Sequence, residues 1–423
     1  MILLLLLLVF APIIQAEPTL LVVQSLDESA ASIGIESGTI NPHAVTLGNI
    51  PNDILAQNTR IYVSNSGYNN IQEIDAETSE TLREIQIPDG VNVYSMALLN
   101  DDSMAVTCSI SGNVIVIRLS DELPVANLQA GVSPQCIIVY GDYFYVADTG
   151  VSFPDYGSGI VYVFDRRTFS QVDSIPVAKN PQAMVIDEQG RLHVVCTGNY
   201  SDISGEIDII DLASREPLTE IPIGGSPSNI SIGAGIAYLA AGGWGAEGYV
   251  YAYRVSDFSI LFDAANPIET GSGAWDVEAL NDGSFFVSCF NDDLIEKRAQ
   301  DGQLIQSYLV SDGPGQMSIY HDIEAAAVRP ETVGESIVLV SAYPNPFNGS
   351  TRLELNHRTQ KSLNIKIFNS IGQLVDMITI GEGMESATWN IQSRFGIPLS
   401  TGVYYAVLSQ RQGNYVNRLF YIK

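Results

Sequence analysis

The sequence is constrained most by a pattern of short strands that recurs along most of its length. The clearest copy spans Ile61–Ile87, where two strand patterns joined by a Ser/Gly/Asn turn are followed by a third. A lone three-stranded ribbon cannot bury both of its apolar faces, so such a unit is expected to repeat. Seven copies follow one another at intervals of 41, 43, 40, 48, 45 and 48 residues, aligned on Val22, Val63, Val106, Val146, Val194, Leu239 and Val287.

Each copy has room for four strands. The third apolar stretch is followed by a turn, often Gly-x-x-Pro as in Gly48–Pro51 and Gly131–Pro134, and a fourth strand then leads into the next copy. Four antiparallel strands in about 40 to 45 residues is the blade period of a β-propeller. The sequence therefore predicts an all-β, seven-bladed β-propeller over residues 17–322.

The phase of the repeat predicts how the ring closes. The first copy begins at Leu20 with the strand that is second in every later blade, so its innermost strand is missing. After the seventh copy, Gln316–Tyr320 reads as one more inner strand without the rest of a blade. We expect this segment to pair with the N-terminal strands and complete blade one, which would remove both free sheet edges.

One copy also resembles a known repeat family. The stretch IYVSNSGYNNIQEIDAETSETLREIQIPDG, which starts at Ile61, is similar to the YVTN-family propeller repeat. The resemblance extends over roughly residues 19–322 and is loosest in the last two copies. It implies the propeller fold, and it names no ligand.

The repeat stops near residue 322, and a different domain is expected beyond it. Residues 323–338 lack strand alternation and read as a linker. Residues 339–423 contain about seven alternating strands with Gly and Asn turns, the pattern of a small immunoglobulin-like β-sandwich. Three motifs in this tail, Tyr343–Asn348, Ile367–Gln373 and Ser400–Tyr405, resemble the type IX secretion C-terminal sorting domain. The resemblance implies that the secretion machinery handles the chain and leaves it at the cell surface or outside the cell.

The two ends of the chain agree on export. Residues 1–16 carry a short apolar core followed by a small-residue cleavage pattern, and we interpret them as a signal peptide. The run is short for a membrane span, and no other transmembrane segment is expected. The predicted protein is therefore exported through the outer membrane.

Charge argues against nucleic acid as a partner. The formal net charge is −28. Residues 339–423 hold 8 Lys/Arg and 4 Asp/Glu, a net of +4, so the remainder carries −28 − 4 = −32. An acidic propeller repels nucleic acid and anionic membranes, and no basic patch with interleaved aromatic residues occurs. Solubility outside the cell is the simplest explanation of this charge.

Strand direction predicts one face for binding. Because the strands of a blade alternate, the turns leading into the inner strands share a face with the loops between second and third strands. The residues entering the inner strands there are Asn52, Asp53, Gln135, Gln182, Ser228, Asn229, Trp275, Asp276 and Gln316. The loops of blades four to six are longer and bring Phe153, Asp155, Tyr156, Tyr200, Asp202, Trp244 and Glu247 to the same face.

This face is the candidate ligand site. Exposed aromatic rings stack on sugars or anchor peptides, and carboxylates bind hydroxyls or amines. The alternative is that the long loops only pack on one another. No catalytic residue is assigned. Carboxylate-only calcium, for example at Asn291–Asp293 or at Asp148 with Asp155, stays open, although these residues are also ordinary turn formers.

Histidine placement disfavours an enzyme. His193 and His321 are expected on the opposite face, His43 on an outer strand and His357 in the tail, so a histidine metal site or a Ser/His/Asp system is not expected. The main hypothesis is a non-enzymatic recognition or adhesion module. The alternatives are a divalent-cation-dependent propeller lyase or hydrolase and a structural surface-layer component.

Four cysteines are few for an exported chain. Cys108, Cys196 and Cys289 share one late position of the repeat, which favours small buried side chains over a disulfide framework. A single disulfide between Cys108 and Cys136 stays open.

Overall fold

The computed structural model describes residues 17–320 except 58, 153–154 and 243–246, and residues 339–422 except 356–357, 360–361, 370–373, 392–398 and 411–412. The chain divides into two compact units, Met1–Ala327 and Val328–Lys423. Every regular element in the described residues is a β-strand, which confirms the all-β prediction. The predicted signal peptide and linker, with Phe153, Trp244, His321 and His357, lie outside the described residues.

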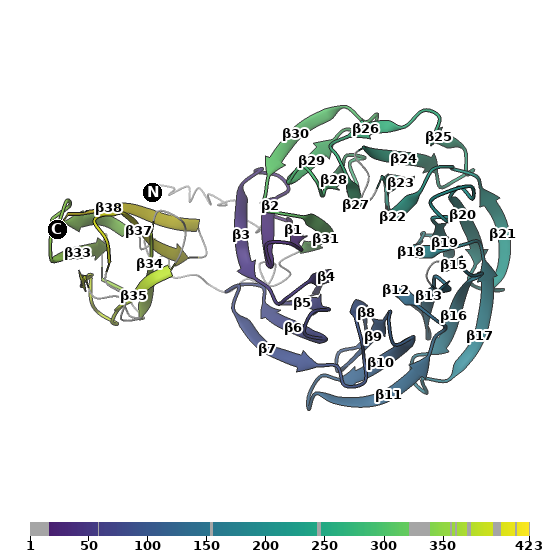
Figure 1. Cartoon of the computed structure of the whole chain (residues 1–423), viewed down its shortest axis with the longest axis horizontal. Coiled ribbons are helices and arrows are strands. Elements are labelled where there is room, and N and C mark those ends of the chain that lie inside the picture. Colours follow the sequence, from purple (N-terminus) through teal and green to yellow (C-terminus); the bar gives the residue numbers. More distant parts are fainter. Residues whose placement is uncertain are drawn as a thin grey trace, which may run out of the picture. The chain divides into compact units, whose positions relative to one another are not determined.

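The described strands of the first unit form antiparallel sheets arranged around a ring (Figure 1). Four of these sheets, from the inner to the outer strand, are β31 (Pro314–Tyr320), β1 (Thr19–Gln24), β2 (Ser29–Gly34), β3 (Ile40–Thr46); β4 (Pro51–Gln57), β5 (Arg60–Asn65), β6 (Asn70–Asp75), β7 (Thr81–Gln86); β8 (Val93–Asn100), β9 (Ser103–Cys108), β10 (Asn113–Arg118), β11 (Leu123–Gln129); and β12 (Pro134–Tyr140), β13 (Tyr143–Asp148), β16 (Gly159–Asp165), β17 (Gln171–Val177).

Three further sheets continue the ring. They are β18 (Pro181–Ile186), β19 (Arg191–Cys196), β20 (Glu206–Asp211), β21 (Glu216–Ile221); β22 (Pro227–Gly233), β23 (Ile236–Ala241), β24 (Gly248–Arg254), β25 (Ile260–Phe262), with β26 (Ile268–Thr270) also on β24; and β27 (Ala274–Ala279), β28 (Phe285–Cys289), β29 (Leu294–Arg298), β30 (Leu304–Leu309). A two-stranded ribbon, β14 (Val151–Ser152) and β15 (Asp155–Tyr156), stands apart from them. Four-stranded antiparallel sheets around a ring are the architecture of a propeller.

The core lies between neighbouring sheets. Strands β5 and β9 in the second position are buried at every residue after the first, because each of their faces packs on another sheet. The outer strand β7 is mostly exposed and buries Ile85. This gradient explains why the second strands carry the strongest apolar signal in the sequence.

Each inner strand is irregular just after its first residue. In β4, Pro51 pairs with Asn65 but Asp53 already pairs with Ser64, and the same shift in register follows Pro134, Pro181 and Pro227. A bulge of this kind places two successive side chains where a regular strand would place one. The bulges therefore let the second and third residues of each inner strand share the region around the ring axis.

The ends of the ring meet in one sheet. Strand β31 pairs with β1, with Leu20 opposite Ile319 and Val22 opposite Met317. The N–H groups of Ser25 and Leu26 extend the contact by donating to the carbonyls of Gly313 (2.9 Å) and Asp312 (3.3 Å). A strand that follows the last sheet thus completes the first, so β1 has a hydrogen-bonded neighbour on both sides.

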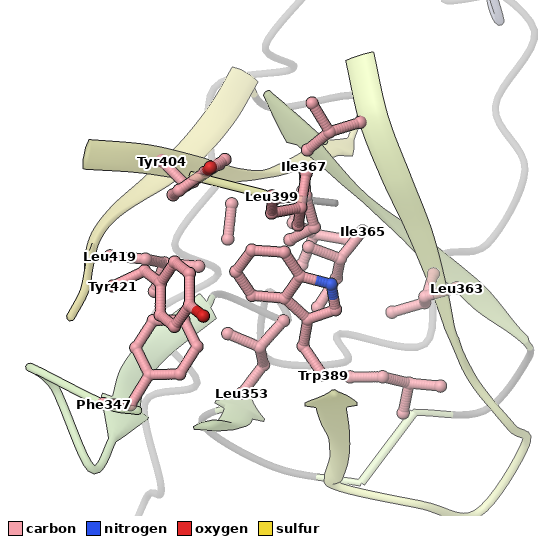
Figure 2. Close-up of a cluster of buried hydrophobic side chains, with 14 of the residues drawn as sticks. Phe347, Leu353, Leu363, Ile365, Ile367, Trp389, Leu399, Tyr404, Leu419 and Tyr421 are labelled. Carbon is pink, nitrogen blue, oxygen red and sulfur yellow. The ribbon is translucent and has the colours of Figure 1, made fainter. Parts of the chain in front are cut away.

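The second unit has two described sheets. They are β32 (Leu339–Tyr343), β33 (Ser350–Leu355) and β36 (Ser386–Asn390), and β35 (Leu374–Ile380), β34 (Leu363–Asn369), β37 (Gly402–Gln410) and β38 (Gly413–Tyr421). Figure 2 shows Trp389 within its core, with Leu353 and Ile365 nearby. The indole N–H of Trp389 donates to the Asp376 carboxylate at 2.8 Å, which satisfies its only polar atom.

Candidate functional site

Three of the predicted site residues meet on the long-loop face. Tyr156 at the end of β15 and Tyr200 in the loop after β19 place their ring centroids 6.0 Å apart, edge to face. Gln182, the second residue of β18, donates its amide N–H to the Tyr200 hydroxyl at 3.0 Å. Tyr200 is nevertheless 56% exposed, so one side of its ring is open to a ligand. We call Tyr156, Tyr200 and Gln182 the tyrosine cluster.

The backbone conformation of Tyr200 and a hydrogen bond to the Tyr156 carbonyl hold the tyrosine cluster in place. Tyr200 has a φ of 56°, a left-handed conformation that is uncommon for a bulky residue. The Lys179 ammonium donates to the Tyr156 carbonyl at 2.8 Å, which ties the β14–β15 ribbon to the turn before β18.

A third tyrosine, which was not among the predicted residues, belongs to the same region. Tyr94 is the second residue of β8 and stands at the repeat position of Asn52, Gln135 and Gln182. Burial raises the pKa of Tyr94 to about 12, with smaller contributions from Asp53 and Tyr200. Aligning blade three with its neighbours at this position would have identified it.

Two other predicted residues meet through their side-chain amides. The Asn229 side chain donates to the Gln316 side-chain oxygen at 2.8 Å. Their strands, β22 and β31, are separated in the ring by β27, so both side chains reach past that strand. These two predicted residues are therefore brought together, but in a second group apart from the tyrosine cluster.

The two aspartates of this set fasten neighbouring sheets together. One Asp276 oxygen accepts the N–H of Met317 in the next sheet at 2.7 Å, and the other accepts the N–H of Val277 at 2.8 Å. Asp53 repeats this arrangement with the Met96 N–H at 3.2 Å. Burial raises the pKa of Asp276 to about 7, and the Asp53 carboxylate adds to the increase. These contacts give both carboxylates a structural role.

The remaining predicted residues are spread over the face. The Asn52 amide donates to the Val93 carbonyl at 3.0 Å, and the Gln135 carbonyl accepts from the Thr107 hydroxyl at 2.7 Å. Trp275 is half-buried against Phe290, with ring centroids 5.4 Å apart. The residues at these inner-strand positions stabilise contacts between sheets, and only part of their surface is open to a ligand.

The described loop carboxylates are bound locally. Asp202 accepts from the Asn199 amide at 2.8 Å, and Glu247 accepts from the Tyr249 hydroxyl. Asp155 lies in β15, and its side chain is outside the described residues. None of these three joins the tyrosine cluster through a described hydrogen bond.

The carboxylates considered as calcium ligands accept hydrogen bonds from backbone N–H groups. Asp148 accepts N–H groups from Ser133 at 2.7 Å, Val132 at 3.1 Å and Gly150 at 3.2 Å. Asp292 accepts the Ser272 N–H at 2.7 Å. Among the described residues, no group of three or more His, Cys, Asp or Glu side chains could hold a metal ion.

The opposite face carries two adjoining clefts of about 540 and 560 Å³. They share Ile236, Arg254 and Gln300. Nearby, buried His193 contacts the Tyr253 hydroxyl at 2.6 Å and the Asp187 carboxylate at 3.0 Å. Burial lowers the pKa of His193. Because the His193 and Asp187 side chains are buried between sheets, their contacts support the fold.

All four cysteines are free thiols. Cys108, Cys196 and Cys289 are buried, and Cys136 is half-buried. Burial raises the pKa of the Cys108 and Cys136 thiols to about 12. A protonated thiol is a poor nucleophile, so these side chains act as small packing groups.

The second unit decides where the protein goes. Residues 341–423 match the family described as the secretion system C-terminal sorting domain. The tail is a secretion sorting domain. Its Tyr343–Asn348 motif is tied to the last strand, since the Phe420 N–H donates to the Asn345 side chain at 2.7 Å and the Phe347 N–H donates to the Phe420 carbonyl at 2.9 Å.

The sorting domain confirms the predicted localisation. The type IX secretion system exports the protein to the cell surface or the extracellular space. No helix among the described residues has the length and apolarity needed to cross a membrane.

Solved structures resemble the fold. A hydrazine synthase structure from Kuenenia stuttgartiensis aligns with 64% of this chain and 95% of its own, at 14% identity and a TM-score of 0.53. A protein of unknown function from Desulfotomaculum acetoxidans aligns with 72% and 99%, at 11% identity and a TM-score of 0.57. At such identities the likeness concerns the fold alone. No curated protein matches the sequence.

Proposed function

We propose that the exported protein is a recognition or adhesion module whose tyrosine cluster binds its ligand without converting it. In this proposal residues 17–322 form a seven-bladed, YVTN-like propeller, residues 323–338 a linker, and residues 339–423 an immunoglobulin-like sorting domain. Residues 1–16 act as the signal peptide. The single observation that carries the proposal is the exposed Tyr200 ring, oriented by Tyr156 and Gln182.

The chemistry of the cluster favours a neutral, hydroxyl-rich ligand such as a glycan. An exposed aromatic ring stacks on the apolar face of a sugar, and neighbouring amides bind its hydroxyls. Residues 1–338 carry a net charge of −32, which disfavours anionic ligands. A peptide anchored by an apolar side chain is the other ligand class that the exposed ring could bind.

Binding to immobilised glycans and peptides tests the proposal, with the purified full chain as the probe. Tyr200→Ala and Tyr156→Ala should each weaken binding at least tenfold, because each removes one ring of the cluster. Tyr68→Ala is the matched control, since Tyr68 is 59% exposed in the corresponding loop of another sheet. Equal binding by all four proteins would refute the cluster as the site.

The same measurement separates the alternatives. Turnover of a bound ligand that requires a divalent cation would favour the lyase or hydrolase. A protein that binds no member of either array, while assembling with itself at the cell surface, would favour the structural component.

A further inference from the structure

A serine, a histidine and an aspartate meet where the ring closes. The serine and the histidine share a hydrogen bond, and the aspartate lies at ion-pair distance from the histidine. The Ser311 hydroxyl lies 3.0 Å from His43 Nε2, and His43 Nδ1 lies 3.1 Å from an Asp27 oxygen. Ser311 is in the turn before β31, His43 is on β3, and Asp27 is in the turn after β1. All three therefore depend on the strand pairing that completes the first sheet.

The positions of these groups assign a role to each atom. The Asp27 carboxylate lies 3.1 Å from Nδ1 and its negative charge favours the imidazole tautomer with its proton on that nitrogen. Nε2 is then an acceptor, and the Ser311 hydroxyl donates to it. This is the order of groups that activates a serine: a base adjacent to the hydroxyl and a carboxylate that orients the base.

The local backbone directs His43 toward this contact. Ser32 pairs with Asn41 and Ala30 pairs with Val45, so residues 42, 43 and 44 stand opposite the single residue 31. The corresponding irregularity in β11 is smaller, because Pro124 and Ala126 there pair with consecutive residues of β10. A larger bulge can redirect a side chain out of the regular strand pattern.

Four further hydrogen bonds hold the segments in place. Buried Gln24 donates to the Ser29 hydroxyl and to the Pro42 carbonyl, both at 2.7 Å, and its side-chain oxygen accepts the Ser311 N–H. The Ser29 hydroxyl in turn donates to Asp27 at 2.7 Å. One buried side chain thus connects the segments that bear all three groups. The imidazole itself is 59% exposed, and Ser311 is half-buried.

We propose that Ser311 is an activated nucleophile that reacts with small, uncharged carboxylic esters. Its oxygen would attack the ester carbonyl while His43 Nε2 takes the hydroxyl proton. The alkoxide would leave with that proton as the alcohol, giving an acyl-serine. Water would then hydrolyse the acyl-serine with His43 as the base, which releases the acid and restores the serine.

The surroundings define the substrate class and the speed. Leu26 is 61% exposed beside Asp27 and offers an apolar contact to a short acyl chain, while Asp27 and Asp312 disfavour an anionic substrate. The Ser311 N–H is already donated to Gln24, so it does not stabilise an oxyanion. Loss of one such donor costs about 10²- to 10³-fold in rate. We therefore expect slow acylation, which is best followed as a single turnover.

A fluorophosphonate reagent tests the nucleophile on the purified full chain. The serine oxygen replaces fluoride at phosphorus, and peptide mass mapping identifies the modified residue. Ser311 should react at least tenfold faster than any other serine. Ser66 is the matched reference, since it lies in a similar surface turn and its hydroxyl donates to the Ile50 carbonyl at 3.1 Å. Absence of a preference for Ser311 in the unmodified protein would overturn the proposal.

Variants separate activation from a structural role. His43→Gln should slow labelling of Ser311 at least tenfold, Asp27→Asn should slow it less, and Ser311→Ala should remove the single-turnover release of nitrophenolate from p-nitrophenyl acetate. Unchanged labelling in a folded His43→Gln protein would contradict activation. If His43→Gln fails to fold, the rates of Ser311 labelling in Asp27→Asn and in the unmodified protein still test the proposal. Tyr68→Ala, which changes an exposed side chain outside both the tyrosine cluster and these three groups, should leave Ser311 labelling unchanged.

Discussion

The buried aspartates at the starts of the inner strands illustrate how a residue can look functional and act structurally. Replacing Asp276 with Ala would leave the Val277 and Met317 N–H groups without their acceptor. Each unpaired buried donor costs about 1–3 kcal/mol, so we expect a loss of about 2–4 kcal/mol in the free energy of unfolding. Urea denaturation measures this. Exposed Asp202→Ala is the control, and an equal effect of both changes would contradict the inter-sheet role.

Glu278 on β27 predicts a pH dependence of stability. It is half-buried, and burial, followed by the nearby Asp276 carboxylate, raises its pKa to about 8. A carboxyl group with a raised folded-state pKa contributes its full stability below its unfolded pKa and loses that contribution as pH rises through about 8. Glu278→Gln cannot ionise, so it should be more stable than the parent at pH ~9 and not at pH ~4.

The expected gain for Glu278→Gln at the higher pH is about 1–3 kcal/mol, since one pKa unit corresponds to about 1.4 kcal/mol and solvent screens part of the effect. Thermal unfolding at both pH values measures it. Exposed Glu188→Gln is the control for loss of one negative charge. A gain of the same size at both pH values would show that ionisation of Glu278 is not its cause.

The sequence predicts the role of a residue only where that role depends on the position of the residue in the repeat. Strand direction placed Gln182 and Tyr200 on one face, and the structure joins them by a hydrogen bond. The sequence could not show that Asp276 binds the next sheet, because that role depends on its neighbour's backbone. The chain from Asp27 through His43 to Ser311 was equally hidden, since the three groups meet only when the ring closes.

At the scale of single strands, β31 has the largest expected effect on stability. Deleting residues 314–322 removes the partner of β1 and exposes the apolar row that includes Leu20 and Val22. Burial of apolar surface contributes about 25 cal/mol per Å², so loss of a strand from the ring should lower the unfolding temperature sharply. Calorimetry measures the change. Deletion of residues 324–332, which has the same length, is the control.

The outcome of that deletion tests the closure of the ring. An unfolding temperature equal to that of the control deletion would contradict the contribution of β31. The period of the repeat was enough to predict strands and their order, because each second strand needs apolar residues on both faces. The bulges after the first residue of the inner strands were not predicted, since a single extra residue leaves the alternation nearly unchanged.

At the scale of the whole molecule, the sorting domain and the ring of sheets belong to separate compact units. The chain forms two compact units, and the sorting-domain match falls within the second. The two also differ in charge, with +4 on residues 339–423 and −32 on the remainder. Each unit has its own buried core, so each is expected to tolerate changes in the other.

Export should therefore follow the tail and not the ring. Removing residues 339–423 should leave the protein in the periplasm. Trp389→Ala should reduce export, because loss of a buried Trp costs about 3–5 kcal/mol of stability. Met384→Ala is the control, since Met384 is 56% exposed in the same unit. Immunoblots of the medium, the cell surface and the periplasm measure the distribution. Unchanged export of the protein lacking residues 339–423 would mean that another part of the chain carries the export signal. Reduced export of Trp389→Ala, with unchanged export of Met384→Ala, would show that the machinery recognises the folded tail.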